Sequence, residues 1–135
     1  MINTAEIVII GGGISGLATA FNLANMGMKD IVLLEQNYLM SGSTGRCGAG
    51  VRQQWGTEMN CALSKASNDI FENINEILNY EGDVEFEQSG YLLMAITEKE
   101  VEQFKLNIEL QHKMGIMSEL LSPQEALEIV PELNT

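Results

Sequence analysis

The sequence predicts an α/β protein that begins with a parallel βαβ unit. Three observations predict this unit: a strand pattern at residues 6–10 whose last four residues are apolar, a glycine-rich turn at residues 11–16, and an apolar run at residues 31–34. The apolar segment between the turn and the second run fits a helix that packs on the two strands. A long helix, an antiparallel strand pair and two further helices are expected to follow.

The turn Gly11-Gly12-Gly13-Ile14-Ser15-Gly16 has the spacing of a dinucleotide-binding loop. Gly11 permits the tight turn out of the strand, Gly13 lets the backbone approach a pyrophosphate, and Gly16 allows close packing of helix and strand. The amides that begin at Ile14 have no acceptor inside the helix and together carry about half a positive charge. The sequence therefore predicts a phosphate site at the start of this helix.

Glu35 follows the second strand, at the expected separation of about 20 residues from the glycine motif. A carboxylate in this place accepts hydrogen bonds from both hydroxyls of an adenosine ribose and repels a phosphate on the 2′ oxygen. We therefore expect a dinucleotide with an unmodified ribose and not NADP. Gly27 is expected to end the intervening helix in the left-handed conformation. A structural glycine turn without a ligand is the alternative interpretation.

The formal charge of −12 comes entirely from the second part of the chain. Residues 1–57 hold three acidic and three basic side chains, whereas residues 58–135 hold sixteen acidic and four basic ones. Nucleic acids and anionic membrane surfaces are bound by clustered Lys and Arg, so this distribution argues against both partners. The first apolar run has no basic flank and is broken by glycines. We therefore expect no signal peptide, no membrane span and a cytoplasmic location.

The cysteines and the single histidine predict no metal site. Cys47 and Cys61 lie fourteen positions apart without a C-x-x-C pair, and His112 is the only histidine. We expect Cys47 to be a small buried side chain with no redox role. We expect His112 to complement the end of its helix and to bind no ligand.

Hydrophobic periodicity and turn signals predict the elements after residue 56. Thr57 is the expected N-cap of a helix over residues 58–80, and Gly115 is expected to end a charged helix over residues 98–114. Ser122 opens a capping box for a short helix that stops before Pro131. The long helix carries an apolar stripe, and the strand pair brackets a turn at residues 88–90. The stripe comprises Met59, Leu63, Ala66, Ile70, Ile74 and Ile77, the strands span 84–87 and 91–96, and the last helix spans 123–130.

NAD and FAD share an ADP half, so the glycine motif alone does not separate these cofactors. Residues 41–50 are small and include four glycines, which argue against a regular element. Extended FAD runs past the second strand, where the amides of such a loop reach the second phosphate, the ribityl chain and the ring edge. A flexible surface loop is the alternative interpretation of this segment.

The glycine motif, Glu35 and the segment 42–55, GSTGRCGAGVRQQW, resemble the N-terminal part of FAD-dependent amine oxidoreductases of the D-amino-acid-oxidase-like superfamily. Within the superfamily, the sequence is most similar to the β subunits of sarcosine oxidase and dye-linked L-proline dehydrogenase, and more distantly to glycine oxidase. The likeness covers essentially the whole chain, and its most specific part is residues 8–55.

The resemblance implies a two-domain flavoprotein, with FAD across a Rossmann-like domain and a mixed or antiparallel sheet over the substrate side. Residues 1–80 would be the N-terminal part of the FAD domain, and residues 81–135 would begin the substrate domain. In such enzymes a hydride passes from the α-carbon of an amine or amino acid, here of the sarcosine, proline or glycine type, to flavin. Such relatives continue for a few hundred residues. A missing C-terminal part or a partner subunit would therefore complete the site, and this segment alone would be inactive.

Carried over residue by residue, the resemblance also implies the cofactor contacts. The glycine motif would hold the pyrophosphate, the end of the second strand would hold the adenosine, and the later loop would border the ribityl chain and the isoalloxazine. The residues are Gly11, Gly13, Ile14, Ser15 and Gly16 for the pyrophosphate, Glu35 and Gln36 for the adenosine, Ser43 and Thr44 for phosphate or ribityl oxygens, and Ala49, Gly50 and Val51 for the ring.

Arg46 and Arg52 are the only cations near this path. Each either stabilises the anionic reduced flavin or caps an exposed loop, and no catalytic residue is assigned beyond these two candidates. Trp55 either lines the ring or anchors the long helix in the core. Two rival functions stay open: a non-catalytic nucleotide-binding or regulatory subunit, and part of an NAD-dependent dehydrogenase.

Overall fold

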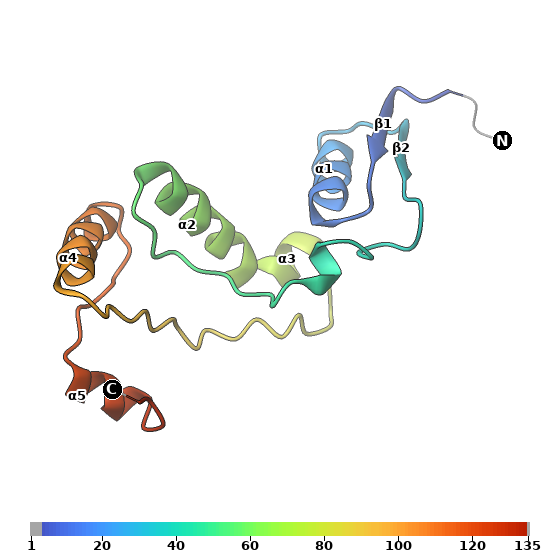
Figure 1. Ribbon diagram of the computed structural model, residues 1–135. Helices are drawn as coiled ribbons and strands as arrows, with labels where there is room; N and C mark the ends of the chain where they lie inside the picture. Colours follow the sequence, from blue (N-terminus) through green and yellow to red (C-terminus); the bar gives the residue numbers. More distant parts are fainter. Residues whose placement is uncertain (1–3, 135) are drawn as a thin grey trace. The chain divides into compact units, whose positions relative to one another are not determined.

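The computed structural model describes residues 4–134, and the chain divides into two compact units between Gly50 and Val51 (Figure 1). This boundary differs from the domain boundary that the sequence suggests at residue 80. The boundary at residue 80 concerns the longer fold of the resembling enzymes and stays a prediction.

The first unit contains the predicted βαβ arrangement. Its elements are β1 (Ile7–Ile10), α1 (Ile14–Asn25) and β2 (Ile31–Leu34). The strands are parallel, with Ile7 opposite Ile31 and Ile10 opposite Leu34, and α1 packs against both of them. Gly27 adopts a φ of +93° just beyond the helix. The prediction that the helix ends at a left-handed glycine is therefore confirmed.

The two faces of the strand pair differ in what covers them. Ile9 is 9% exposed, whereas Val8 and Ile10 on the opposite face of β1 are 53% and 86% exposed. Because successive side chains of a strand point to opposite faces, α1 covers only the Ile9 face. The parallel arrangement also brings the carboxyl ends of β1 and β2 to one edge of the pair. The glycine motif and Glu35 both start from this edge.

The second unit is helical. Its elements are α2 (Glu58–Glu72), α3 (Ile74–Leu78), α4 (Glu98–Lys113) and α5 (Pro123–Ile129). The long helix expected over residues 58–80 is interrupted at Asn73. There the side chain Nδ2 of Asn73 donates to the carbonyl oxygen of Asp69 at 2.8 Å, and its amide donates to the carbonyl of Ile70 at 3.2 Å. Asparagine side chains compete with the backbone for such bonds, which favours a break in the helix.

The predicted antiparallel strand pair is wrong. Residues 84–96 contain no strand, and the only strands among residues 4–134 are the parallel β1 and β2. Glu85, in the middle of the first expected strand, has a φ of +55°, which is incompatible with extended backbone. An isolated two-stranded hairpin is also marginally stable without a third strand or a helix to cover it. The hydrophobic pattern of residues 84–96 alone therefore does not produce strands.

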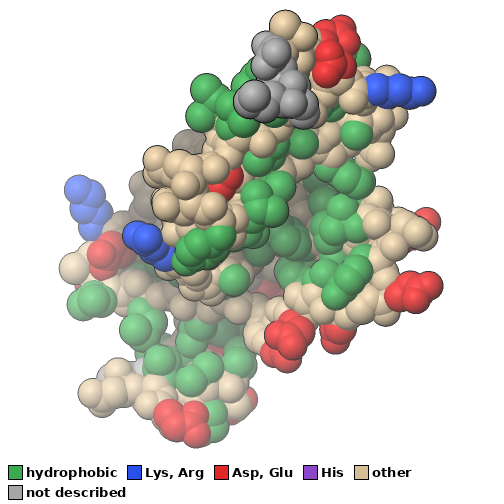
Figure 2. Space-filling model, turned by 90° about the vertical axis from the view of Figure 1, so that its right-hand side faces the viewer, with side chains coloured by type: hydrophobic (Ala, Val, Ile, Leu, Met, Phe, Trp, Pro, Cys, Tyr) green, Lys and Arg blue, Asp and Glu red, His purple; other side chains and the backbone are tan. Residues whose placement is uncertain are grey.

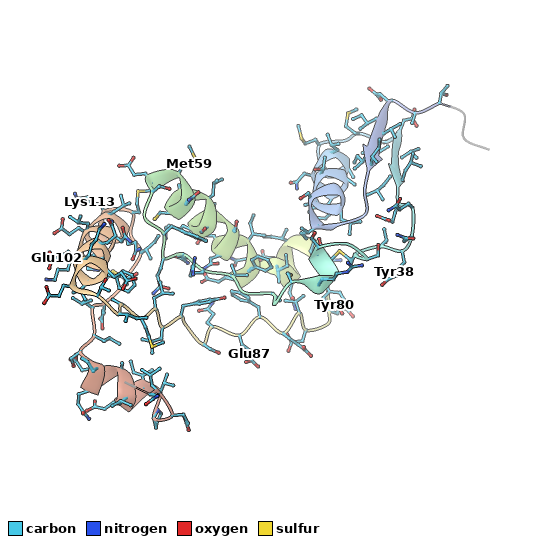
Figure 3. All side chains as sticks on the ribbon, viewed as in Figure 1. Tyr38, Met59, Tyr80, Glu87, Glu102 and Lys113 are labelled. Atoms are coloured by element: carbon cyan, nitrogen blue, oxygen red, sulfur yellow. The ribbon has the colours of Figure 1, made fainter. Side chains whose placement is uncertain are left out.

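The apolar stripe of α2 is largely exposed. Met59 is 68% exposed and points away from the helix (Figure 3), and Leu63 is 61% exposed. The buried side of α2 instead carries Cys61, which is 0% exposed. Periodicity identifies side chains that share a face of a helix, but it does not identify what covers that face. Exposed hydrophobic side chains are prominent in the space-filling view (Figure 2).

The predicted caps at Thr57, Gly115 and Ser122 are confirmed. The Thr57 hydroxyl oxygen accepts from the amide of Asn60, and Ser122 and Glu125 form a reciprocal capping box. Gly115 follows α4 with a φ of +74°. His112 lies in the last turn of α4, and its Nε2 is 2.7 Å from the carbonyl oxygen of Ser118. Among the described residues, no helix has the length and apolar content needed to cross a membrane.

Candidate functional site: the start of α1 and the end of β2

Gly11 and Gly16 have the structural roles that the motif predicts. Gly11 adopts a φ of +106°, a conformation that L side chains rarely reach, and its amide donates to the carbonyl oxygen of Leu34 at 2.8 Å. A Cβ on Gly16 would collide with the carbonyl oxygen of Gly11 and lie 3.4 Å from Cγ2 of Ile9. The turn therefore needs glycine at both positions for reasons of backbone geometry and packing.

Thr44 connects the second loop to the start of α1. It lies in a single 3₁₀ turn, η1 (Thr44–Arg46), where the sequence had argued against a regular element. Its Oγ1 accepts from the amide of Ile14 at 3.1 Å. Gly13, the N-cap, offers no side-chain acceptor, and a Cβ there would lie 3.1 Å from the same Oγ1. Thr44 thus caps one free amide of the first turn and leaves the following amides available to an anion.

Glu35 is bound to the glycine turn through its carboxylate. One oxygen accepts from the amide of Gly12 at 2.8 Å, and the other accepts from the amide of Asn37 at 2.9 Å. These hydrogen bonds hold the pKa of Glu35 below its ordinary value. The bond from Asn37 lowers it most, and the bond from Gly12 comes next. The carboxylate is therefore ionised and fixed at the edge where β1 and β2 end, with lone pairs left to accept from further donors.

Gly12 is the residue of this site that the sequence reasoning missed. It is buried, its amide binds Glu35, and its carbonyl oxygen accepts from the amide of Met40 at 2.9 Å. A Cβ on Gly12 would lie 2.6 Å from Cδ2 of Leu39 and 3.2 Å from Cβ of Glu35. The available signal was the run of three consecutive glycines, because the dinucleotide-binding motif itself requires only the first and third of them.

Glu35 gives a pH-dependent prediction. Because its pKa is lowered in the folded protein, the stability that it contributes is fully present above its unfolded pKa of about 4.3 and is lost as the pH falls through the lower folded value. The free energy of unfolding should therefore differ between the wild type and Glu35→Gln by a constant amount above about pH 5. The difference should shrink in stronger acid. Denaturant titrations of both proteins across this range test it, and a difference that varies near neutral pH would contradict it.

The remaining predicted contacts in the first unit are solvent-exposed. These residues lie on the surface, and their roles as cofactor contacts stay predictions: Ser15, Gln36, Ser43, Arg46, Ala49 and Gly50. The expectation that Cys47 is buried is wrong. Cys47 is exposed, and its thiol donates to the carbonyl oxygen of Thr44 at 3.1 Å. The tight 3₁₀ turn brings this carbonyl to the thiol while the side chain stays at the surface.

Val51, Arg52 and Trp55 belong to the second unit and are half-buried. The guanidinium carbon of Arg52 lies 4.1 Å from the centre of the Trp55 ring. The indole Nε1 donates to the Arg52 carbonyl oxygen at 3.0 Å. The Nε of Arg52 is buried and has no hydrogen-bond partner within residues 4–134. Arg52 is therefore not the exposed loop cap that one interpretation expected, and Trp55 is only partly in the core.

Comparison with known protein families matches residues 6–135 to the DAO family, described as FAD dependent oxidoreductase. The chain belongs to this family. Membership selects FAD from the two dinucleotides that share an ADP half. The half-buried, ionised Glu35, the side-chain-free cap at Gly13 and the open space over Gly11 fit the ADP part of such a cofactor. The resemblance of the glycine motif and of segment 42–55 to FAD-dependent amine oxidoreductases is thus confirmed at the family level.

Three similar proteins illustrate the range of names within the family. The sarcosine oxidase subunit beta of Rhodobacter capsulatus is 28% identical over 130 residues, which cover 96% of this chain and 31% of the relative. Human mitochondrial dimethylglycine dehydrogenase is 35% identical over 131 residues, 96% of this chain and 15% of the relative. The regulatory subunit of pyruvate dehydrogenase phosphatase from mouse is 31% identical over 130 residues, again 96% and 15%. The chain thus spans less than a third of the length of these relatives.

Proposed function

We propose that this chain is the FAD-binding N-terminal portion of an oxidoreductase that transfers a hydride from the α-carbon of an amine or amino acid to flavin. The proposal is carried by one observation: the start of α1, the ionised Glu35 and Thr44 from the second loop meet at the edge where β1 and β2 end. The names of two relatives, a sarcosine oxidase subunit and a dimethylglycine dehydrogenase, support a small secondary or tertiary amine as the substrate.

In this proposal, different residues bind the ribose and the pyrophosphate of the ADP moiety. Glu35 accepts from the ribose hydroxyls, and the first-turn amides around Ser15 bind the pyrophosphate. Arg46 and Arg52 supply positive charge toward the flavin ring, and Ala49 to Val51 border it. FAD, when bound, supplies the redox chemistry, while the protein supplies binding, orientation and exclusion of water. The rest of the fold, in the same polypeptide or in a partner subunit, supplies the substrate groups.

The experiment that tests this function is anaerobic titration of the purified full-length protein. It should be yellow, and its visible flavin absorbance should be bleached by at least one of sarcosine, dimethylglycine, proline or glycine. NADPH, which carries a 2′-phosphate, should neither bind nor bleach it. A flavin spectrum that none of these amines changes would contradict the proposed reaction, and a colourless protein would contradict the proposed cofactor.

A non-catalytic regulatory subunit is the second candidate, because one relative carries the name of such a subunit. In this case ADP or FAD would stabilise the protein against thermal unfolding, but no amine would bleach bound flavin. Measuring both quantities on one preparation separates the two candidates.

A further inference from the structure

Arg52 is attached to Trp55 through both its side chain and its backbone. The guanidinium carbon lies 4.1 Å from the centre of the indole ring, and the indole Nε1 donates to the Arg52 carbonyl oxygen at 3.0 Å. A guanidinium over the face of Trp is attracted by the negative charge on that face. The two contacts together fix both the position of the Arg52 backbone and the direction of its side chain.

Trp55 is held in turn by α4. Gln111, 4% exposed, donates from its Nε2 to the Trp55 carbonyl oxygen at 2.9 Å. The buried thiol of Cys61 donates to the same oxygen at 3.4 Å. The next residue, Gly56, approaches the same face of α4 so closely that a Cβ there would lie 3.0 Å from Oδ1 of Asn107. The segment that carries Arg52 therefore lies against α4 at Asn107 and Gln111, which are one helical turn apart, and the hydrogen bond from Gln111 fixes it there.

The Arg52 guanidinium has a hydrogen-bond donor that no described residue pairs. The indole face offers no oxygen acceptor to the N–H groups of the guanidinium. The Nε is buried and finds no acceptor among the described residues. Leaving a buried donor unpaired costs free energy. Such a donor is therefore expected where a ligand or another part of the protein supplies its acceptor. Negative charge suits this donor best.

We propose that Trp55 and Gln111 are positioning residues for the Arg52 guanidinium. This inference rests on the proposed function, in which Arg52 directs positive charge toward the flavin ring. Trp55 holds the guanidinium by its ring face, and Gln111 holds Trp55 through a hydrogen bond from α4. In this inference α4 acts on the Arg52 guanidinium indirectly, through the hydrogen bond from Gln111 to Trp55.

A double-mutant cycle on the full-length flavoprotein tests this inference, with the two-electron reduction equilibrium of the flavin as the measured quantity. Arg52→Met should shift this equilibrium at least tenfold toward the oxidised form, which is about 30 mV for a two-electron couple. Trp55→Leu should produce most of this shift, and it should produce no further shift in the Arg52→Met background. Trp55→Phe, which keeps an aromatic face, should retain most of the wild-type equilibrium.

Gln111→Leu provides a second variant should Trp55→Leu fail to fold. It should shift the equilibrium in the same direction, whereas the matched change Gln103→Leu, at an exposed position of the same helix, should not. Additive shifts of Trp55→Leu and Arg52→Met would overturn the inference, as would a shift by Arg52→Met that neither Trp55→Leu nor Gln111→Leu reproduces. If Arg52→Met itself causes no shift, the proposed role of Arg52 fails and the positioning role fails with it.

Discussion

A Gly13→Val variant of the full-length protein is expected to lose its flavin. Gly13 is the N-cap of α1, with extended backbone and no side chain between the first-turn amides and an incoming pyrophosphate. A Cβ there already lies 3.1 Å from Oγ1 of Thr44, and the two methyl groups of valine would occupy the space around this oxygen. The variant should therefore exclude the phosphates and also disturb the Thr44 cap. Flavin content per mole of folded protein is the quantity to measure.

Gly27→Asn is a matched control for this experiment. Gly27 lies beyond the other end of α1, has a φ of +93° and has open space around a Cβ. Asparagine tolerates the left-handed conformation better than other residues, so this variant should fold and keep its flavin. Circular dichroism establishes that both variants are folded. A folded Gly13→Val protein with full flavin content would show that the pyrophosphate does not lie at the start of α1.

Glu35→Ala should weaken binding of ADP and FAD roughly ten- to hundredfold, because hydrogen bonds to an ionised carboxylate are stronger than those between neutral groups. The loss should be confined to ligands with a free ribose diol. The discrimination against 2′-phosphate should disappear, since the repelling charge is removed. Isothermal titration of the flavin-free full-length protein with ADP and with 2′-phosphorylated ADP measures both effects.

Asp30→Asn is the control for the loss of a carboxylate. Asp30 precedes β2 at the end opposite Glu35, and its Oδ2 accepts from the amide of Glu6 at 3.0 Å. This variant removes one negative charge next to the same strand, so its ADP affinity should stay within about twofold of the wild type if only the Glu35 carboxylate binds ribose. Equal losses in both variants would indicate a general electrostatic effect and would contradict the ribose assignment.

The sequence predicts the first unit of the fold well because each of its elements has a local signal. Gly11 must adopt a positive φ, Gly16 must let α1 approach the strand, and Glu35 must follow β2. Caps such as Thr57 and Ser122 are equally local, since the side chain binds an amide three residues away. Each of these features can be predicted from residue type and spacing within one motif.

The expectations that differ from the structure concern features that local pattern does not determine. Residues 84–87 alternate and residues 91–96 form an apolar run, both of which are typical of strands, but a strand forms only when another strand or a packed layer pairs with it. The break at Asn73 reflects a competition between two sets of hydrogen bonds that differ little in free energy. The exposure of Cys47 and the role of Gly12 depend on how residues 41–50 fold back on the glycine turn. The hydrogen bond that joins these two segments links Ile14 to Thr44, which are 30 residues apart in the sequence.

The contacts of Arg52 also could not be predicted from the sequence. Its residue type and its place after the glycine-rich loop made it a candidate, but two interpretations stayed open. The contact with Trp55 is local, whereas the hydrogen bond that holds Trp55 spans 56 residues to Gln111. No pattern in the sequence connects these positions, because polar bonds to a backbone carbonyl carry no signature in the residue type of the acceptor.

A crystal structure of the full-length protein with its cofactor tests the central claim most directly. We expect a ribose hydroxyl of the ADP moiety within hydrogen-bond distance of the Glu35 carboxylate, and pyrophosphate oxygens on the amides between Gly13 and Gly16. An ADP moiety that binds anywhere else on the protein, or one that leaves the Glu35 carboxylate without a ribose contact, would contradict the account.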